Sequence, residues 1–430
     1  MSILRKPLDA IELSDLEDLV AAEARETNEL EFKGTLPFKP EKGQPQTADR
    51  WIEKGDKVGT YARDQILAEL VAFANADGGT LILGLHETRE HPRRAERLEP
   101  LPRCEDLARR LLDGTEDIIE PRLAMAEARA IPIDDTGAGY VVMRVGKSLM
   151  APHRLTSTRE FYIRRGERAA VMDIREIRDL TLNLARIGDR IDQAFKERRA
   201  EMHAKYKSLF TATAGNILPF AARATALPMV PVSIPTLTAR QDLWWRGCGF
   251  TMQVGAQPYS CEYPARDFDD YPKIRLRSLQ SAPSDTLKGV SRHVSADGMV
   301  EFCLAAERRT LGNGEGGPFA RIYAGWMIGL VVGALAQIHH LRSKLALDGV
   351  EFGLEVEILA QRPTWLQWDN NSDSASRMEH NGSIVMPRYS VGPQPEFDTL
   401  IQTFLIDLSN VAGNRWDYPC EIPWDRLLPQ

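Results

Sequence analysis

The acidic stretch NELEFK, residues 28–33, contains residue types at a spacing that could do chemistry. Side chains alternate between the two faces of a β-strand, so Leu30 and Phe32 would enter a core while Glu29, Glu31 and Lys33 share the other face. Carboxylates that converge beside a lysine can hold Mg²⁺ or Mn²⁺ and contact a phosphate, as phosphodiester cleavage requires. Alternating Glu and Lys is also ordinary for a solvated strand face, and the six residues alone leave both interpretations open.

Composition limits the classes of protein to which the chain can belong. It has 430 residues, 27% of them charged, a net charge of −7 and a pI of about 5.8, so it is expected to be globular and to bind nucleic acid only through local basic patches. Five cysteines lie far apart without a CxxC pair, which argues against a thiolate zinc site or a disulfide scaffold and favours a cytoplasmic location. The N-terminus lacks the apolar core of a signal peptide. The longest apolar run, WMIGLVVGALAQ from Trp326, is shorter than the roughly 20 residues of a spanning helix and predicts a buried helix, with no membrane contact.

The elements that would position the acidic stretch can be predicted from periodicity. Apolar residues of YARDQILAELVAFANADGG recur at helical spacing until Asp77-Gly78-Gly79 ends the pattern, and TLILGL then predicts a buried strand. Further strands are expected at 139–145 and 160–166. The glycines at 78 and 79 are read as a helix stop and turn, because a phosphate-binding loop would need a preceding strand and a lysine.

A long helix is expected to follow this first region. Its apolar residues form a heptad seam that either packs on its own domain or joins two copies of the chain: Ile177, Leu180, Leu184, Ile187 and Ile191. The expected organisation is a first domain over residues 1–172, a connecting helix over 173–213 and a C-terminal α+β domain over 214–430.

Four stretches of the first region resemble a known family. They are ETNELEFK from residue 26, ELVAFANADGGTLILGLHE from residue 69, APHR from residue 151 and FYIRRGE from residue 161. Together, over about residues 15–180, they resemble the Schlafen-type AlbA_2 domain. The resemblance implies an α+β fold with a mixed sheet and helices; residues 215–430 carry no recognised pattern.

The resemblance also implies an activity. Several Schlafen proteins are metal-dependent endoribonucleases that cut tRNA, and such an enzyme would suit a bacterial antiphage or stress response. Their acidic site falls on Glu26, Glu31, Lys33 and Glu87, with Mg²⁺ or Mn²⁺ held by the three glutamates. GLHE stands where relatives often have two aspartates, so His86 is a further candidate ligand or proton carrier. Vertebrate relatives carry two copies of the domain and this chain carries one, which predicts a homodimer.

Basic residues near these motifs are candidates for contacts with RNA or DNA. They are Arg93, Arg94, Arg164 and Arg165. The C-terminal region would act as a sensor or dock a partner protein, and its tryptophans would either pack in a core or stack bases. Two other functions remain open: a non-catalytic nucleic-acid-binding transcriptional regulator, and a nucleotide-binding module, which the missing phosphate-loop lysine disfavours.

Overall fold

The computed structural model describes residues 3–39, 58–211, 217–247, 249–255, 257–261, 271–281, 289–309, 320–345, 347–360, 364–368, 375–378 and 383–428. The chain divides into two compact units: unit 1 comprises residues 1–189 and 342–351, and unit 2 comprises residues 190–341 and 352–430. Each contains both helices and strands, so the α+β class predicted from the sequence is confirmed. The Pro-, Gly- and Lys-rich composition of residues 34–59 predicts a long exposed loop, and most of these residues lie outside the described ranges.

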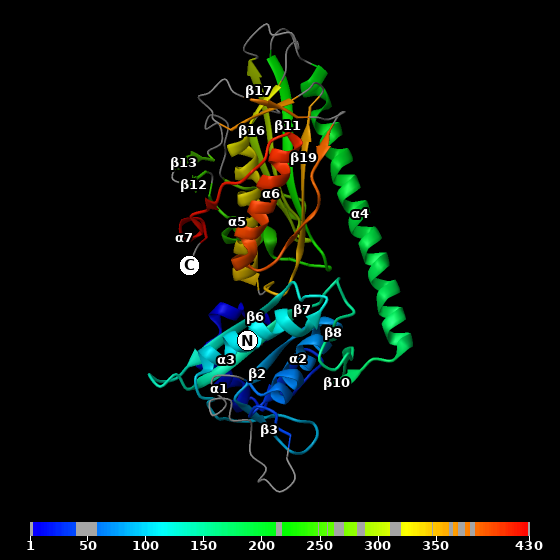
Figure 1. Ribbon diagram of the computed structural model, residues 1–430, viewed down its shortest axis with the longest axis vertical. Coiled ribbons are helices and arrows are strands. Elements are labelled where there is room, and N and C mark those ends of the chain that lie inside the picture. Colours follow the sequence, from blue (N-terminus) through cyan, green and yellow to red (C-terminus); the bar gives the residue numbers. More distant parts are fainter. Residues whose placement is uncertain are drawn as a thin grey trace. The chain divides into compact units, whose positions relative to one another are not determined.

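A mixed four-stranded sheet organises unit 1 (Figure 1). Its order is β1 (Leu30–Lys33), β2 (Gly78–Leu83), β7 (Gly139–Gly146) and β6 (Ala126–Pro132). Only the pair β1–β2 is parallel, and the chain between these two strands includes helix α2 (Thr60–Ala74). A parallel pair needs such a crossover, which explains why the predicted helix precedes the predicted strand.

Helices cover both faces of this sheet. Helices α2 and α3 (Cys104–Ile118) share one apolar core with Leu81 and Leu83, whereas α1 (Leu13–Ala21) shares another with Leu30 and Phe32. The predicted inward direction of Leu30 and Phe32 is therefore confirmed. Glu31 pairs in register with Leu81, and Lys33 with Leu83, so both charged side chains lie on the α2 face. Glu29 precedes the strand and is exposed, so it is not part of this row.

Asn75, at the C-terminal end of α2, joins this helix to a distant segment of the chain. Asn75 caps the helix and Gly78 takes a φ of +84°, so the predicted helix stop is confirmed. The Asn75 amide donates to the carbonyl oxygens of His153 (2.9 Å) and Tyr162 (2.8 Å), and its oxygen accepts from the His153 N–H (2.7 Å). This side chain thereby fixes strand β9 (Tyr162–Arg165) beside α2, and β9 carries Arg164.

Short hairpins complete unit 1. Strand β3 (Leu85–Glu87) pairs with β4 (Ala95–Leu98), and β9 pairs with β10 (Arg168–Val171) through the turn at Gly166. Strands β5 (Ile119–Glu120) and β8 (Arg154–Leu155) form a third pair. The first hairpin positions Glu87, and the second positions Arg164.

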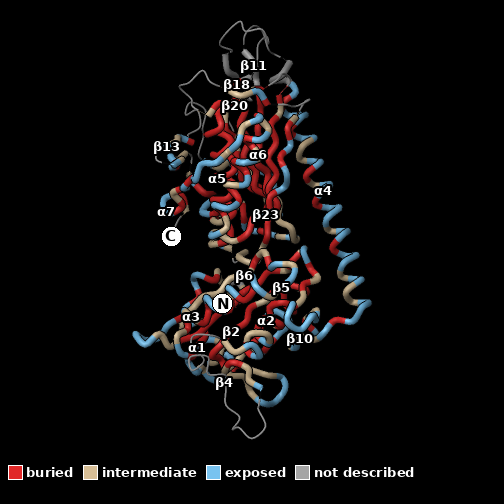
Figure 2. Tube along the Cα trace, viewed as in Figure 1, coloured by how far each residue is buried: buried red, intermediate tan, exposed pale blue. Residues whose placement is uncertain are grey.

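Unit 2 is built on an antiparallel eight-stranded sheet. Along the sheet the strands are β14 (Lys273–Arg275), β15 (Ser278–Ser281), β16 (Gly289–Ser295), β17 (Val300–Arg309), β11 (Ile217–Pro228), β19 (Phe352–Leu359) and β22 (Ile384–Val385), and β23 (Tyr389–Val391) also pairs with β19. Figure 2 shows the central strands as buried.

Smaller elements of unit 2 flank this sheet. They are the sheet of β12 (Thr251–Val254), β13 (Gln257–Ser260) and β24 (Cys420–Glu421), the sheet of β18 (Ala320–Tyr323), β20 (Thr364–Gln367) and β21 (Ser376–Arg377), and the helices α6 (Phe397–Val411) and α7 (Trp424–Leu427). The long helix α4 (Ile174–Thr211) contributes residues to both units.

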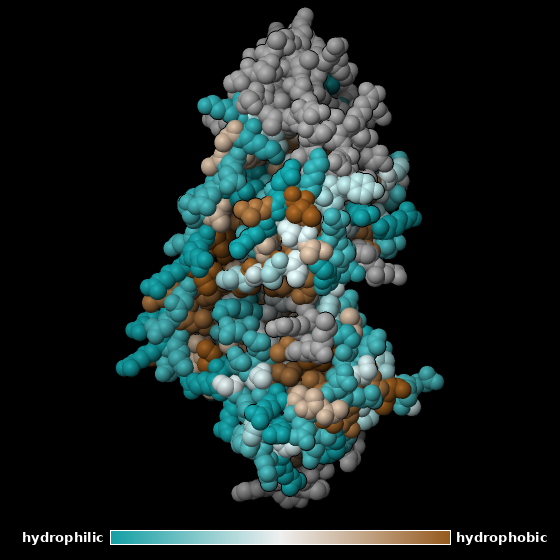
Figure 3. Space-filling view, turned by 180° about the vertical axis from the view of Figure 1, so that it is seen from behind, coloured by the Kyte–Doolittle hydropathy of each residue, from teal (hydrophilic) through white to brown (hydrophobic). Residues whose placement is uncertain are grey.

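Helix α5 (Ala324–Leu345) is the described helix whose length and apolar composition would allow it to cross a membrane. Of its most apolar window, 94% is buried inside the structure, and a core helix passes the same test of length and composition. The predicted buried helix is confirmed. Hydrophilic side chains predominate among the coloured residues of the surface in Figure 3, with separate hydrophobic patches between them.

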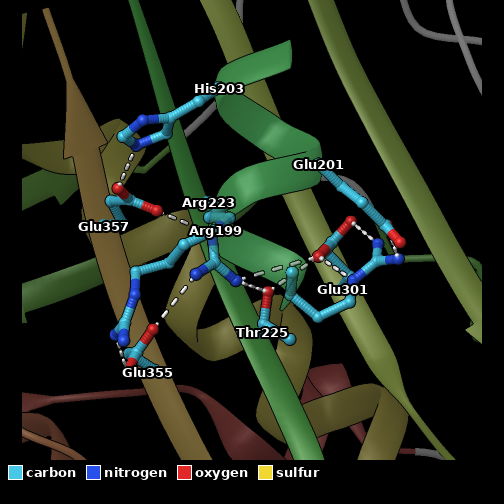
Figure 4. A network of polar contacts seen from close by, with 9 residues as sticks. Arg199, Glu201, His203, Arg223, Thr225, Glu301, Glu355 and Glu357 are labelled. Carbon is cyan, nitrogen blue, oxygen red and sulfur yellow. Dashed lines mark hydrogen bonds and ion pairs between the residues drawn. The ribbon is translucent and has the colours of Figure 1, made fainter. Parts of the chain in front are cut away.

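A buried arginine lies at the centre of the unit 2 sheet (Figure 4). Arg223 on β11 is fully buried, and its guanidinium donates to Glu357 and Glu355 on β19, each at 3.0 Å. It also donates to the hydroxyl of Thr225, which in turn donates to Glu301 on β17 at 2.8 Å. These side chains share the sheet face that receives α4.

Side chains of helix α4 bind the same three glutamates. The pairs are Arg198 with Glu301, Arg199 with Glu355 and His203 with Glu357, each at 2.7 Å. Burial alone would raise the pKa of Glu301, but Arg198, Arg223 and the Thr225 hydroxyl hold it below its usual value. The second half of α4 is therefore held on the sheet by charge as well as by apolar contacts of Met202 and Tyr206.

Candidate acidic site

The first part of the site is a buried ionic cluster on the α2 face of the unit 1 sheet. Glu31 is 2% exposed; its Oε1 binds the Lys33 ammonium and its Oε2 accepts from the Arg164 guanidinium at 3.0 Å. Arg164 also binds Glu69 of α2 at 2.7 Å, and Lys33 lies 3.5 Å from the same carboxylate. The charged side chains of β1 are thus covered by α2 and β9. They do not form a solvated strand face.

The second part is a pair of carboxyl groups, Glu26 and Glu87. The chain turns between Thr27 and Leu30, so the Glu26 side chain folds back and its Oε1 accepts the Phe32 N–H at 2.9 Å. Glu87 Oε1 accepts from Arg93. Among the described residues, the Oε2 atoms of both glutamates are buried and receive no donor, and the two carboxyl groups lie within hydrogen-bonding reach of each other. Two such oxygens can share a proton or a cation.

Electrostatics favour a proton there in the absence of a cation. Burial, and then the nearby charges of Glu31 and Glu87, raise the pKa of Glu26 to about 8. Burial and Glu31 also raise the pKa of Glu69, against the effect of Lys33 and Arg164. Burial alone would lower the pKa of Lys33, but Glu31 and Glu69 raise it. With Glu26 neutral, three carboxylates (Glu31, Glu69, Glu87) face three cations (Lys33, Arg93, Arg164).

This pair should make stability depend on pH. Because the pKa of Glu26 rises from 4.5 to about 8 on folding, the native chain binds more protons in that window, and the free energy of unfolding must fall as pH rises through it. We expect Glu26→Gln, which cannot ionise, to remove most of this dependence, which for a shift of this size amounts to at most about 5 kcal/mol. Urea unfolding of the wild type and variant at several pH values measures the difference. If the free energy of unfolding changes with pH to the same extent in the wild type and the variant, the raised pKa of Glu26 is contradicted.

The carboxylate oxygens of this site could supply part of the ligand set of a hard divalent cation. Mg²⁺ commonly uses one or two protein carboxylates together with substrate phosphates and water. Glu26 and Glu87 each offer one oxygen that has no partner among the residues the structure describes, whereas both oxygens of Glu31 are bound, to Lys33 and Arg164. Within the described ranges, no group of three or more His, Cys, Asp or Glu side chains is arranged to hold a metal ion. The residues present therefore fit a two-carboxylate site rather than a complete three-glutamate cage.

The structure brings six of the eight residues singled out from the sequence together: Glu26, Glu31, Lys33, Glu87, Arg93 and Arg164. Arg94 and Arg165 instead form ion pairs at the surface with Glu23 (2.5 Å) and Glu176 (2.6 Å). His86 binds Glu99 at 2.9 Å and packs over Gly34. The side chain of Arg164, assigned to nucleic-acid contact, is 1% exposed and bound by two carboxylates, so it presents no free guanidinium to a phosphate.

Sequence reasoning missed Glu69. It lies three residues after Ile66 and four before Phe73, both fully buried, so it occupies the apolar stripe of α2. A charged residue among buried apolar positions predicts that a partner of opposite charge is buried with it. This pattern was the sequence signal for Glu69. Phe73 adds to the same arrangement, because the Arg164 guanidinium lies 4.6 Å from the centre of its ring.

Comparisons with known proteins give a family match and a similar solved structure. Residues 26–173 match the model of the family described as Schlafen, AlbA_2, and no curated protein matches the chain. A similar solved structure is the solution NMR structure of the N-terminal domain of a putative ATP-dependent DNA helicase RecG-related protein from Nitrosomonas europaea. It is 19% identical and covers 32% of this chain and 74% of that chain, with a TM-score of 0.21. The family match indicates a nucleic-acid-related function. Residues 26–173 of this chain form a Schlafen AlbA_2 domain.

Proposed function

We propose that this chain is a metal-dependent endoribonuclease of Schlafen type that cleaves tRNA or another structured RNA. The observation that carries the proposal is a pair of buried oxygens on Glu26 and Glu87, which accept no hydrogen bond within the described part of the chain and lie next to the Glu31–Lys33 ion pair. An unsatisfied buried acceptor costs about 1–3 kcal/mol, so a site that keeps two together favours a ligand with positive charge.

In this proposal Glu26 and Glu87 would hold one Mg²⁺ or Mn²⁺ ion in place of the proton on Glu26. The bound ion would polarise the phosphoryl group and help to ionise a water molecule. Because the ion competes with a proton whose pKa is about 8, metal affinity should rise with pH up to that value.

The remaining residues have distinct roles. The Lys33 side chain is 23% exposed, and it is the member of the buried cluster that we assign to the scissile phosphate. With Lys33 on a phosphate instead, Glu31 Oε1 would be a candidate third ligand. Arg164 is reassigned from nucleic-acid contact to positioning Glu31 and Glu69. Arg93, Arg94 and Arg165 remain the candidates for the RNA backbone.

A second candidate is a non-catalytic nucleic-acid-binding regulator. The observation that favours it is the internal neutralisation of the cluster, in which Lys33 and Arg164 already occupy both oxygens of Glu31. Such an ionic cluster could serve only to fix the fold of unit 1.

A homodimer is a further part of the endoribonuclease proposal. It is supported by two apolar side chains of α4, Ile174 and Leu182, which are 78% and 55% exposed.

Incubation of the full chain with total tRNA in Mn²⁺, Mg²⁺ or EDTA tests the proposal. We expect discrete fragments with metal only, and Glu87→Gln should reduce their rate of formation by at least about 100-fold. Glu99→Gln is the matched control, because Glu99 is more exposed and binds His86 outside the carboxyl pair. Cleavage that persists in EDTA, or that Glu87→Gln leaves intact, would refute the metal site. RNA binding without cleavage by folded protein would favour the regulator.

A further inference from the structure

Unit 2 contains a cavity of about 600 Å³ with a largely aromatic wall. Its lining includes Tyr259 on β13, Trp368 directly after β20, and Trp416 and Tyr418 in the segment after α6, with Gln257 and Ser409 among the polar members. This volume lies within the roughly 300–1,000 Å³ typical of small-molecule sites. The cavity lies entirely within unit 2, so it is independent of the acidic site.

The aromatic rings form a continuous surface. Trp368 and Trp416 stack with ring centres 4.6 Å apart and planes 27° from parallel. Tyr259 lies at 6.4 Å from Trp368, and Tyr418 meets Trp416 edge-on at 5.6 Å. Four aromatic side chains along one cavity favour a flat ligand that can stack on a ring face.

Two buried polar groups lie at this cavity. The Nε1–H of Trp416 and the hydroxyl of Ser409 are buried, and neither has a hydrogen-bond partner among the described residues. Ser409 as a whole is 1% exposed. Buried Trp N–H and hydroxyl groups normally find partners, so these two call for an acceptor and a further polar group supplied from outside the protein.

The ligand chemistry follows from the two sets of groups. Stacking requires a planar ring, and the indole N–H requires an acceptor at the edge of that ring. We infer that this cavity binds a planar nitrogen heterocycle of nucleobase type, either as a free nucleoside or nucleotide or as an unpaired base of RNA.

Titration of the full chain with each of the four ribonucleosides and with short single-stranded RNA, followed by calorimetry, tests the inference. We expect saturable binding that Trp368→Ala weakens by at least about 10-fold, since base stacking on one aromatic side chain is worth about 1–3 kcal/mol. Ribose is the control ligand. Binding of a nucleoside alone identifies a free ligand, and binding only of the oligonucleotide identifies an RNA base; either supports the inference.

Two further variants separate a ligand site from a structural role. Trp365→Phe changes a tryptophan three positions away that does not line the cavity, and it should leave binding unchanged. Ser409→Ala removes a buried hydroxyl without a partner, so it should weaken binding while the melting temperature stays equal or rises. No saturable binding of any probe at millimolar concentration would overturn the inference. Binding that both Trp368→Ala and Ser409→Ala leave unchanged would do the same.

Discussion

Arg223→Met is expected to lower the free energy of unfolding of the chain by about 3–5 kcal/mol. The guanidinium is fully buried and is the shared partner of Glu355 and Glu357, and it reaches Glu301 through Thr225. Its removal leaves Glu355 and Glu357 to the side chains of α4, Arg199 and His203, which are partly exposed. An uncompensated buried charge is more costly than a lost contact, which is why this single change should have a large effect.

Denaturant unfolding followed by tryptophan fluorescence measures this effect. Seven of the eight tryptophans lie at or beyond Trp244, so the signal reports mainly on unit 2. The control is Arg240→Met, which removes an exposed ion pair with Asp242 and should cost at most about 1 kcal/mol. Adding Glu355→Gln and Glu357→Gln to Arg223→Met should recover part of the loss. Equal effects of Arg223→Met and Arg240→Met would show that the network does not stabilise the sheet.

Arg164→Met is expected to lower the free energy of unfolding of unit 1 by about 3–5 kcal/mol. The variant leaves Glu31 and Glu69 with Lys33 as their common cation, and it removes the hydrogen bond to the Thr27 carbonyl oxygen. The pKa of Glu69 is already raised by burial and Glu31, and without Arg164 it should rise further. Because a protonated Glu69 needs no cation, the difference in free energy of unfolding between variant and wild type should become smaller as pH falls.

Hydrogen exchange of peptides from β1 and α2 reports this change locally. Arg165→Met is the matched control, since Arg165 is the next residue, its side chain is 51% exposed and it pairs with Glu176 at the surface. We expect faster exchange in both peptides for Arg164→Met and wild-type rates for Arg165→Met. A loss of RNA binding by Arg164→Met with wild-type exchange rates would instead restore Arg164 as a nucleic-acid contact.

The sequence by itself determined the local elements around the acidic site. The alternation of Leu30 and Phe32 with Glu31 and Lys33 gave the strand and its buried face, and the apolar period before Gly78 gave α2 and its end. These features depend on neighbouring residues, because the period of a helix or strand is a property of a few consecutive positions. The family resemblance over the first region is confirmed for the same reason: its motifs are contiguous.

Only the tertiary structure decided which charges meet. Arg164 lies 95 positions from Glu69 and 133 from Glu31, and Arg223 lies 134 positions from Glu357, so no local pattern links the partners. The aromatic cavity likewise joins β13, the end of β20 and the segment after α6. Whether a charged residue is solvated surface or a buried partner depends on what packs over it. That outcome is set by the crossing of α2 and β9 over β1, and of α4 over β11, which the local sequence does not encode.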